Sequence, residues 1–232
     1  MSTKKLNKIL AVMATIGLMA GCGGKTTEPT QEIITGSLEY NGYTYKTVKI
    51  GNQWWLAENL RTTKYNDGTN IPNVTNDNQW WNLESGAYCV YDNNNKYVKY
   101  GYLYNFYVVA TGKLAPEGWR VPTEKDFEEL INYCGGGTNA ANKLKSKTNW
   151  IAEIGNGNDT YGFCAYAGGL RSGGISAGFS YIKRFGYWWT SSLASLLAYD
   201  IPYYFIIGSS GHLDFSIDFD ENSGLSIRLI KE

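Results

Sequence analysis

The chain has 232 residues, of which 43% are hydrophobic, 15% aromatic and 18% charged, with 21 basic residues balancing 21 acidic ones. This composition excludes intrinsic disorder, because disordered chains are poor in aromatic residues, and the length allows a hydrophobic core without a disulfide scaffold. The even charge balance supplies no concentrated basic face, so no nucleic-acid partner is expected.

The first residues have the pattern of a secretory signal. An apolar run from Ile9 to Met19 follows three lysines and is too short to span a bilayer as a helix. The run ends in Leu18-Met-Ala-Gly-Cys22, where small residues before a cysteine resemble the bacterial lipobox. We therefore predict a lipoprotein signal peptide over residues 1–21 and lipidation at Cys22. An ordinary signal peptide and a short uncleaved anchor remain the alternatives.

Lipidation at Cys22 implies that a membrane of the cell envelope, most simply the outer membrane, is the first partner. Removing the three signal-peptide lysines from the 21 basic residues leaves the mature chain with a net charge of about −3. Residues 22–38 are small and polar and contain a proline, which predicts a flexible tether before a folded domain over residues 39–232. No dense acidic run follows the cysteine, so the sequence leaves open which membrane face the domain occupies.

The domain begins with a predicted hairpin. Residues Gly42 to Gly51 alternate β-branched and aromatic side chains between two faces, which is typical of a strand. Gly51-Asn52 forms a favourable turn into a second strand over Gln53 to Ala57.

A helix is predicted over residues 123–134. Thr123 is a candidate N-cap, and Asp126 three positions later gives a variant of the capping box. Apolar residues then recur at helical spacing until Gly135, where three glycines end the helix. A second, shorter helix is expected over Asn139 to Ser146.

From Tyr161 onward glycines interrupt aromatic segments, which predicts irregular strands and long Gly-rich loops. Near the end, residues His212 to Phe219 alternate apolar and polar side chains, and a turn leads to Leu225 to Ile230. This pattern predicts a C-terminal hairpin with one buried face. Hairpins at both ends of a helical middle predict an α+β fold of mixed antiparallel sheets, with the termini paired in one sheet.

Several ordered sequence blocks carry a resemblance to a known family. They are Tyr45 to Leu60, Tyr100 to Asn105, Pro116 to Thr123, Leu144 to Ser146, Tyr161 to Phe163, Trp188 to Ser192 and Ser226 to Arg228. Over roughly residues 40 to 230 the chain resembles the Fibrobacter succinogenes major paralogous domain, found in many lipoproteins and secreted proteins of the Bacteroidota. The resemblance implies a fold, because no activity is established for that family.

Two of these blocks are also similar to the formylglycine-generating enzyme group. They are the run ending in Thr123 and the final Ser-Ile-Arg228, and they imply a C-type-lectin-like fold. That group works through a cysteine pair that has no equivalent in this chain, so its activity is not expected here. Family members often carry cysteines where this chain has Ala115 and Leu229. We expect these two residues to lie close together as an apolar replacement.

The remaining chemistry is sparse. Cys89, Cys134 and Cys164 are expected mainly as buried thiols, with any disulfide among them left open. His212 is the only histidine and is expected on an exposed strand face. No zinc-ligand spacing exists, and neither a metal nor a cofactor is predicted. Calcium is the alternative, through oxygen ligands at Asp214, Asp218, Asp220 and Glu221, or at Asp67 with Asn66 and Asn70.

Aromatic clusters are the most suggestive feature, because flat aromatic faces stack on sugar rings. The predicted ligand-binding residues are Trp80, Trp81, Tyr181, Tyr187 and Trp188. The competing interpretation is burial, which we expect for Trp54, Trp55, Trp119 and Trp189 in the family blocks.

The preferred function is a membrane-anchored, non-catalytic recognition or structural module that binds glycan or envelope protein. The alternative is a carboxylate-based envelope hydrolase acting on carbohydrate, with no catalytic residues assigned. Its candidates would be Glu58, Glu117 or Asp218, but the sequence places no two of them at the required separation.

Overall fold

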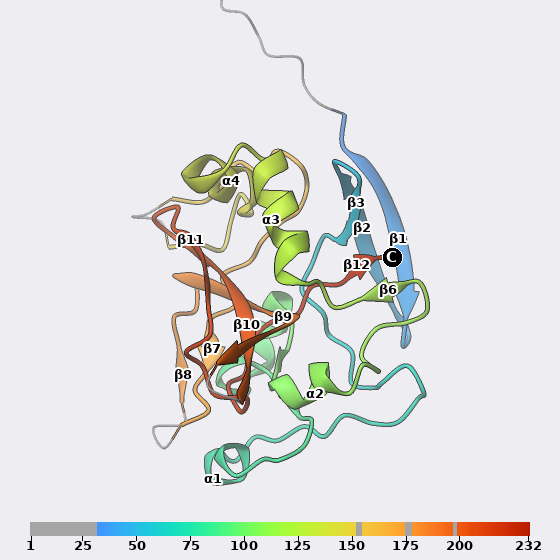
Figure 1. Ribbon diagram of the computed structural model, residues 1–232, viewed down its shortest axis with the longest axis vertical. Helices are drawn as coiled ribbons and strands as arrows, with labels where there is room; N and C mark the ends of the chain where they lie inside the picture. Colours follow the sequence, from blue (N-terminus) through green and yellow to red (C-terminus); the bar gives the residue numbers. More distant parts are fainter. Residues whose placement is uncertain (1–31, 152–154, 175–177, 197–198) are drawn as a thin grey trace, which may run out of the picture. The chain divides into compact units, whose positions relative to one another are not determined.

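The chain forms a mixed α+β fold whose sheets are mostly antiparallel, as the sequence predicts (Figure 1). The computed structural model describes residues 32–151, 155–174, 178–196 and 199–232, so the predicted signal peptide and Cys22 lie outside the described residues. The strands are β1 (Ile34–Tyr40), β2 (Tyr43–Ile50), β3 (Gln53–Leu56), β4 (Tyr88–Cys89), β5 (Leu103–Tyr104), β6 (Trp119–Arg120), β7 (Leu170–Arg171), β8 (Phe179–Ser180), β9 (Phe185–Leu196), β10 (Tyr199–Gly208), β11 (Leu213–Ser216) and β12 (Ile230–Lys231). The helices are α1 (Asp77–Trp81), α2 (Phe106–Ala110), α3 (Glu124–Tyr133) and α4 (Gly137–Leu144), with 3-10 turns η1 (Tyr91–Asn93) and η2 (Asn95–Tyr100).

The two ends of the described chain share a five-stranded sheet in the order β1-β2-β3-β12-β6. The predicted β2–β3 hairpin is confirmed, with Ile50 opposite Gln53 across the expected turn. The last strand, β12, pairs with β3 through Ile230 and Trp55. The prediction that the termini meet in one sheet is therefore correct.

The predicted tether is too long at its C-terminal end. Residues 34–38 belong to β1, which pairs along its whole length with β2, from Ile34 opposite Lys49 to Tyr40 opposite Tyr43. Most side chains of β1 are exposed, so this edge strand depends on backbone hydrogen bonds and leaves little hydrophobic pattern in the sequence.

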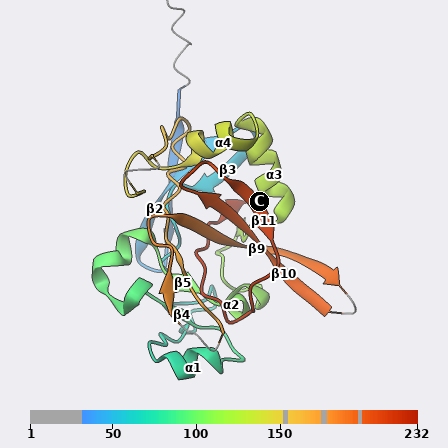
Figure 2. The ribbon, with the colours of Figure 1, turned by 90° about the vertical axis from the view of Figure 1, so that its left-hand side faces the viewer.

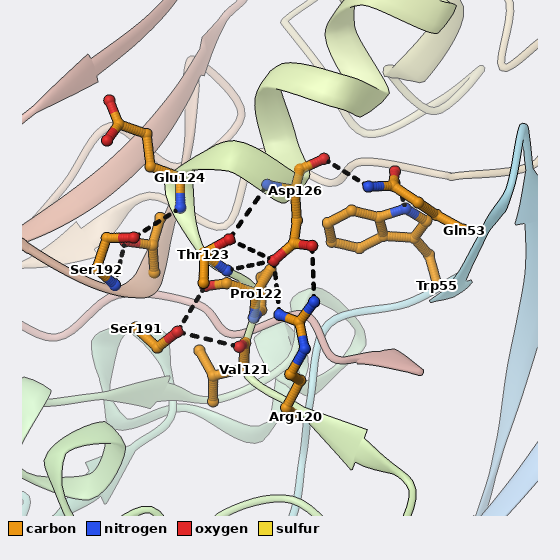
Figure 3. Close-up of polar contacts among 11 residues, drawn as sticks. Gln53, Trp55, Arg120, Val121, Pro122, Thr123, Glu124, Asp126, Ser191 and Ser192 are labelled. Carbon is orange, nitrogen blue, oxygen red and sulfur yellow. Dashed lines mark hydrogen bonds and ion pairs between the residues drawn. The ribbon is translucent and has the colours of Figure 1, made fainter. Parts of the chain in front are cut away.

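The predicted capping box starts α3 (Figure 3). The Thr123 hydroxyl accepts a hydrogen bond from the Asp126 amide at 3.3 Å, and the Asp126 carboxylate accepts one from the Thr123 amide at 2.6 Å. Arg120 forms two hydrogen bonds with the same carboxylate, at 2.6 and 2.7 Å. The second predicted helix is also confirmed, as α4, two residues earlier than expected.

Helix α3 packs between the five-stranded sheet and the sheet β11-β10-β9 (Figure 1). Phe127 and Leu130 are fully buried in a cluster that also contains Trp55 from β3 and Phe205 from β10. The Phe127 and Phe205 rings stack with centroids 4.5 Å apart. The buried face of α3 thus packs against both sheets in one hydrophobic core.

Strands β9 and β10 form an antiparallel ribbon, and its distal part extends beyond the neighbouring elements in Figure 2. The sequence predicted only irregular strands here. The near half of β9 is buried on both faces, so it lacks the alternation that would reveal a long strand.

The predicted C-terminal hairpin is wrong. Strand β11 pairs with β10, from Leu213 opposite Ile207 to Ser216 opposite Tyr204. Residues Leu225 to Ile230 are buried on both faces and instead meet distant segments, with Ser226 bridged to Trp188. This segment therefore runs through the core, whereas the predicted hairpin strand would have had one face exposed to solvent.

The remaining family-based expectation concerns Ala115 and Leu229. Leu229 is buried in the hydrophobic cluster against which Ala115 packs, consistent with an apolar replacement. The C-type-lectin-like comparison stays a prediction.

Candidate functional site

The candidate site is an open groove of about 700 Å³, here named the acidic groove. Its lining residues are Trp81, Tyr107, Gly173, Tyr199, Asp200, Ile201, Pro202, Ile217, Asp218, Phe219, Asp220, Glu221 and Asn222. They come from α1, α2, the segment after β7, the β10 strand of the β9–β10 ribbon and the segment after β11. The groove combines aromatic side chains with four carboxylates and no lysine, arginine or histidine.

Two contacts fix the α1 wall of the acidic groove. The buried Trp80 indole donates a hydrogen bond to the backbone oxygen of Asn222 at 2.7 Å. The Asn222 amide nitrogen donates to the backbone oxygen of Trp81, also at 2.7 Å. Trp80 therefore serves as an anchor, which leaves its neighbour Trp81 at the surface with 39% of its area exposed.

A buried arginine, Arg171, holds the start of α1 in place. The Arg171 guanidinium donates to the backbone oxygens of Val74 and Thr75 and to the Asp77 carboxylate, at 2.7 to 3.0 Å. It also lies 4.4 Å from the centroid of the Trp80 ring. The five-residue helix is too short to be stable alone, so these contacts determine where Trp81 points.

The segment after β11 contributes Asp218 to the lining of the groove. Its carboxylate accepts hydrogen bonds from the Tyr204 hydroxyl and, at 2.7 Å, from the Ser216 hydroxyl. These bonds lower the pKa of Asp218 and keep it ionised. The neighbouring Phe219 ring stacks on Tyr204 with centroids 4.5 Å apart.

The other walls come from α2 and the ribbon. Burial, together with a hydrogen bond to Glu221, raises the pKa of Tyr107 on α2. On the ribbon, Tyr199 is 75% exposed, and the Asp200 carboxylate accepts a hydrogen bond from Ser195 at 2.8 Å. The groove therefore offers aromatic rings and carboxylate oxygens from four separate parts of the chain.

The structure separates the five predicted ligand-binding aromatics. Trp81 lines the acidic groove, and Tyr181 is exposed but lies outside it. Trp80, Tyr187 and Trp188 have at most 7% of their area exposed, so they cannot present a ring face to a ligand. This part of the prediction is corrected: large aromatics of a fold with little helix fill its core.

Sequence reasoning missed Tyr107, Tyr199 and Phe219 as groove residues. Tyr199 belongs to none of the aromatic clusters in the sequence, and the alternation of residues 212–219 predicts a buried Phe219. No local pattern identifies them, because the groove forms only when distant segments meet.

A second cavity of about 410 Å³ contains two carboxylates, Glu58 and Asp159, beside Cys164 and Tyr166. Burial raises the pKa of Asp159, although its carboxylate accepts a 2.7 Å hydrogen bond from the Cys164 amide. Glu58 is bound by Arg61 at 2.9 Å and by the Tyr43 hydroxyl at 2.8 Å. The other two hydrolase candidates lie outside this cavity.

Cys89 and Cys134 are buried free thiols and Cys164 is a partly buried one. Burial raises the pKa of both Cys89 and Cys134 to about 12, which makes them unreactive. His212 is exposed, with its Nε2 3.8 Å from the Asp214 carboxylate. Among the described residues, no three histidine, cysteine, aspartate or glutamate side chains are grouped to hold a metal, which includes Asp214, Asp218, Asp220 and Glu221. Calcium at Asp67 with Asn66 and Asn70 stays a prediction.

The family blocks meet at a buried polar network around Asn59. Its side-chain oxygen accepts hydrogen bonds from the Trp188 indole at 2.9 Å and from Arg228 at 2.8 Å. Its side-chain nitrogen donates to the backbone oxygen of Tyr100 at 2.8 Å and to the Ser226 hydroxyl at 3.2 Å. Four blocks thus converge in the interior, whereas the lining residues of the acidic groove lie outside all the blocks.

A fifth block, Pro116 to Thr123, meets the Trp188 to Ser192 block at the start of α3 (Figure 3). The Ser192 hydroxyl accepts a hydrogen bond from the Glu124 amide at 3.0 Å, and the Ser191 hydroxyl donates to the Val121 and Pro122 carbonyls. The motif residues of the family therefore support the fold in this chain.

Comparison with known proteins supports the family resemblance seen in the sequence blocks. The family model described as the Fibrobacter succinogenes major domain matches residues 48–231. No curated protein and no solved structure matches the chain. Within the part of the chain that the structure describes, no helix has the length and apolar character needed to cross a membrane.

Proposed function

The chain belongs to the Fibrobacter succinogenes major domain family, and from this premise we propose that it is a lipid-anchored cell-envelope protein whose acidic groove binds carbohydrate without catalysis. The observation that carries the proposal is the lining of the groove by Trp81, Tyr107 and Tyr199 together with four carboxylates. Aromatic faces stack on sugar rings, and carboxylate oxygens accept hydrogen bonds from sugar hydroxyls.

The environment of Asp218 does not suit the acid of a glycoside hydrolase. Glycoside hydrolysis requires one carboxylic acid that is protonated at neutral pH, with a raised pKa, to donate to the leaving group. Asp218 has a lowered pKa because of the hydrogen bonds from Tyr204 and Ser216. Asp218 therefore suits an acceptor that orients a ligand.

The anchoring part of the proposal rests on the lipobox-like sequence ending at Cys22. Two or more acyl chains would hold the domain stably at an envelope membrane, and the outer membrane is the proposed site. In the producing cell, the wild-type chain is expected in the membrane fraction with a lipid-modified amino terminus. A Cys22→Ser variant is expected in the soluble fraction, and an unmodified wild-type terminus would contradict the anchor.

Calorimetric titration of the full chain, solubilised in detergent, with a panel of oligosaccharides tests the binding proposal. Trp81→Ala and Tyr199→Ala should each weaken binding of any hit about tenfold, which corresponds to about 1.4 kcal/mol. Tyr181→Ala is the matched control, because Tyr181 is exposed outside the groove. Binding that needs Tyr181 but neither groove aromatic would refute the assignment.

One observation favours the hydrolase alternative. Asp159, with its raised pKa, and Glu58 line the same second cavity, as the two carboxyl groups of a glycoside hydrolase would. If this alternative holds, the chain releases reducing ends from an envelope polysaccharide and Asp159→Asn abolishes the release. Binding of that polysaccharide without turnover favours the recognition module.

A further inference from the structure

Within the described part of the chain, the carboxylates of the acidic groove have no cationic partner. Asp200 and Asp218 accept hydrogen bonds from neutral hydroxyls of Ser195, Ser216 and Tyr204. None of the four groove carboxylates forms an ion pair with a lysine or arginine among the described residues.

Some acidic side chains elsewhere in the fold are arranged differently. Four of them meet a lysine or arginine at 2.6 to 3.2 Å: Glu58 with Arg61, Asp67 with Lys113, Asp77 with Arg171 and Asp126 with Arg120. The groove therefore gathers four unpaired carboxylates in one concave surface that no lysine, arginine or histidine lines. A concave surface of one sign concentrates its potential and attracts ligands of the opposite sign.

A neutral sugar would not balance this charge. Covering Asp220 or Glu221 with an uncharged ring removes water from an ionised group and returns only hydroxyl hydrogen bonds. A ligand that carries ammonium groups supplies the missing counter-charge. It also gains attraction from the ring faces of Trp81 and Tyr199, because aromatic rings attract cations.

We infer that the acidic groove selects a cationic glycan, an oligosaccharide whose rings carry free amino groups; this inference rests on the proposed function. A basic peptide has matching charge but fits the backbone less well. Among the described strands, residues 199–202 of β10 pair with β9 alone, so their other edge is open to an added strand. Pro202 sits in that edge and lacks the N–H that an added peptide strand would need.

A pair of probes that differ only in charge tests this inference. The full chain in detergent is titrated with a glucosamine oligosaccharide and with the N-acetylglucosamine oligosaccharide of equal length. The titrations are run at low salt and mildly acidic pH, where the amines are protonated and the carboxylates remain ionised. We expect the amino form to bind about tenfold more tightly, and this preference should shrink as salt is added.

Isosteric variants separate charge from stacking. Asp220→Asn combined with Glu221→Gln should weaken the amino form about tenfold and leave the N-acetylated form unchanged. Trp81→Ala should weaken both. The matched control, Glu128→Gln combined with Glu129→Gln on exposed positions of α3, should change neither.

The outcomes distinguish the two proposals. Equal binding of both sugars, both dependent on Trp81, overturns the charge selection and leaves the carbohydrate function standing. Binding of neither sugar, while oligolysine binds and responds to the Asp220 and Glu221 variant, overturns both and identifies a basic peptide as the ligand. No binding of any of the three probes overturns the charge selection, and the oligosaccharide panel then decides the carbohydrate function.

Discussion

Replacing Arg228 with methionine should be among the most damaging single changes in the fold. Arg228 is fully buried in the Asn59 network, where its Nη1 donates to Leu56 and Phe163 carbonyls and its Nη2 donates to Asn59 Oδ1 and the Cys164 carbonyl. Burial lowers the pKa of Arg228 to about 10, so the guanidinium is still charged at neutral pH. No carboxylate forms an ion pair with it among the described residues.

The magnitude follows from what methionine leaves behind. Three backbone carbonyls lose a buried donor, and each unsatisfied group costs about 1–3 kcal/mol. Removing a buried charge returns part of this cost, because a guanidinium is expensive to desolvate. We therefore expect a net loss of about 3 kcal/mol in the free energy of unfolding. Arg228→Lys should recover less than half of it, because one ammonium cannot reproduce the planar fork of donors.

Urea unfolding of the full chain, followed by tryptophan fluorescence, measures this loss. Arg184→Met is the matched control, because Arg184 is exposed, and it should change the free energy by no more than about 0.5 kcal/mol. An Arg228→Met protein as stable as wild type would show that an apolar side chain suffices at this position and would refute the reasoning.

Three further predictions concern the same scaffold. Asp126→Ala should cost about 2 kcal/mol at neutral pH through the lost cap and ion pair. Burial raises the pKa of Asp126, but the hydrogen bonds from Arg120 and Thr123 together have the larger effect and lower this pKa overall. The stabilisation by Asp126 is therefore present at neutral pH and is lost as the pH falls below about 3.9. Urea unfolding at neutral pH and at a pH below about 3.9 should show the stabilities of wild type and variant converge in acid, and a constant difference would contradict the reasoning. Gly157→Ala should destabilise the fold, because its Cβ would lie 2.3 Å from the Lys145 carbonyl oxygen, whereas Gly174→Ala meets nothing closer than 3.9 Å and should be neutral in thermal melts; equal effects would refute the steric argument. In the native protein Cys164 should react with a thiol reagent before the two buried thiols, as peptide mapping by mass spectrometry would reveal, and simultaneous labelling of all three would contradict their burial.

Local sequence signals predicted the local structure well. The start of α3 was readable because Thr123 and Asp126 lie three residues apart and bond to each other. The β2–β3 hairpin was readable because its turn lies between its own strands. In both cases the interacting residues are close in the sequence.

Strand pairing between distant segments could not be predicted from the sequence. The segment from Leu225 to Ile230 looked like a hairpin partner for its neighbour, yet Leu225 bridges to Tyr104 and Ile230 pairs with Trp55 and Arg120. Nothing within the segment itself encodes these distant partners, and its mixed apolar and polar pattern suits either arrangement.

The acidic groove shows the same limit. Trp80 and Trp81 are adjacent and chemically identical, but only Trp81 is exposed, because Trp80 bonds to Asn222 from a distant part of the chain. The exposure of Tyr199 likewise depends on how far the β9–β10 ribbon extends. The aromatic composition therefore predicted carbohydrate binding as a hypothesis. Only the fold identifies which aromatic side chains are exposed in the groove.

A crystal structure of the protein soaked with a glucosamine oligosaccharide tests the central claim most directly. The account predicts a sugar ring stacked on Trp81 or Tyr199, with an ammonium nitrogen within about 4 Å of the Asp220 or Glu221 carboxylate. An oligosaccharide bound at Tyr181 or in the cavity of Glu58 and Asp159, with the acidic groove empty, would contradict it.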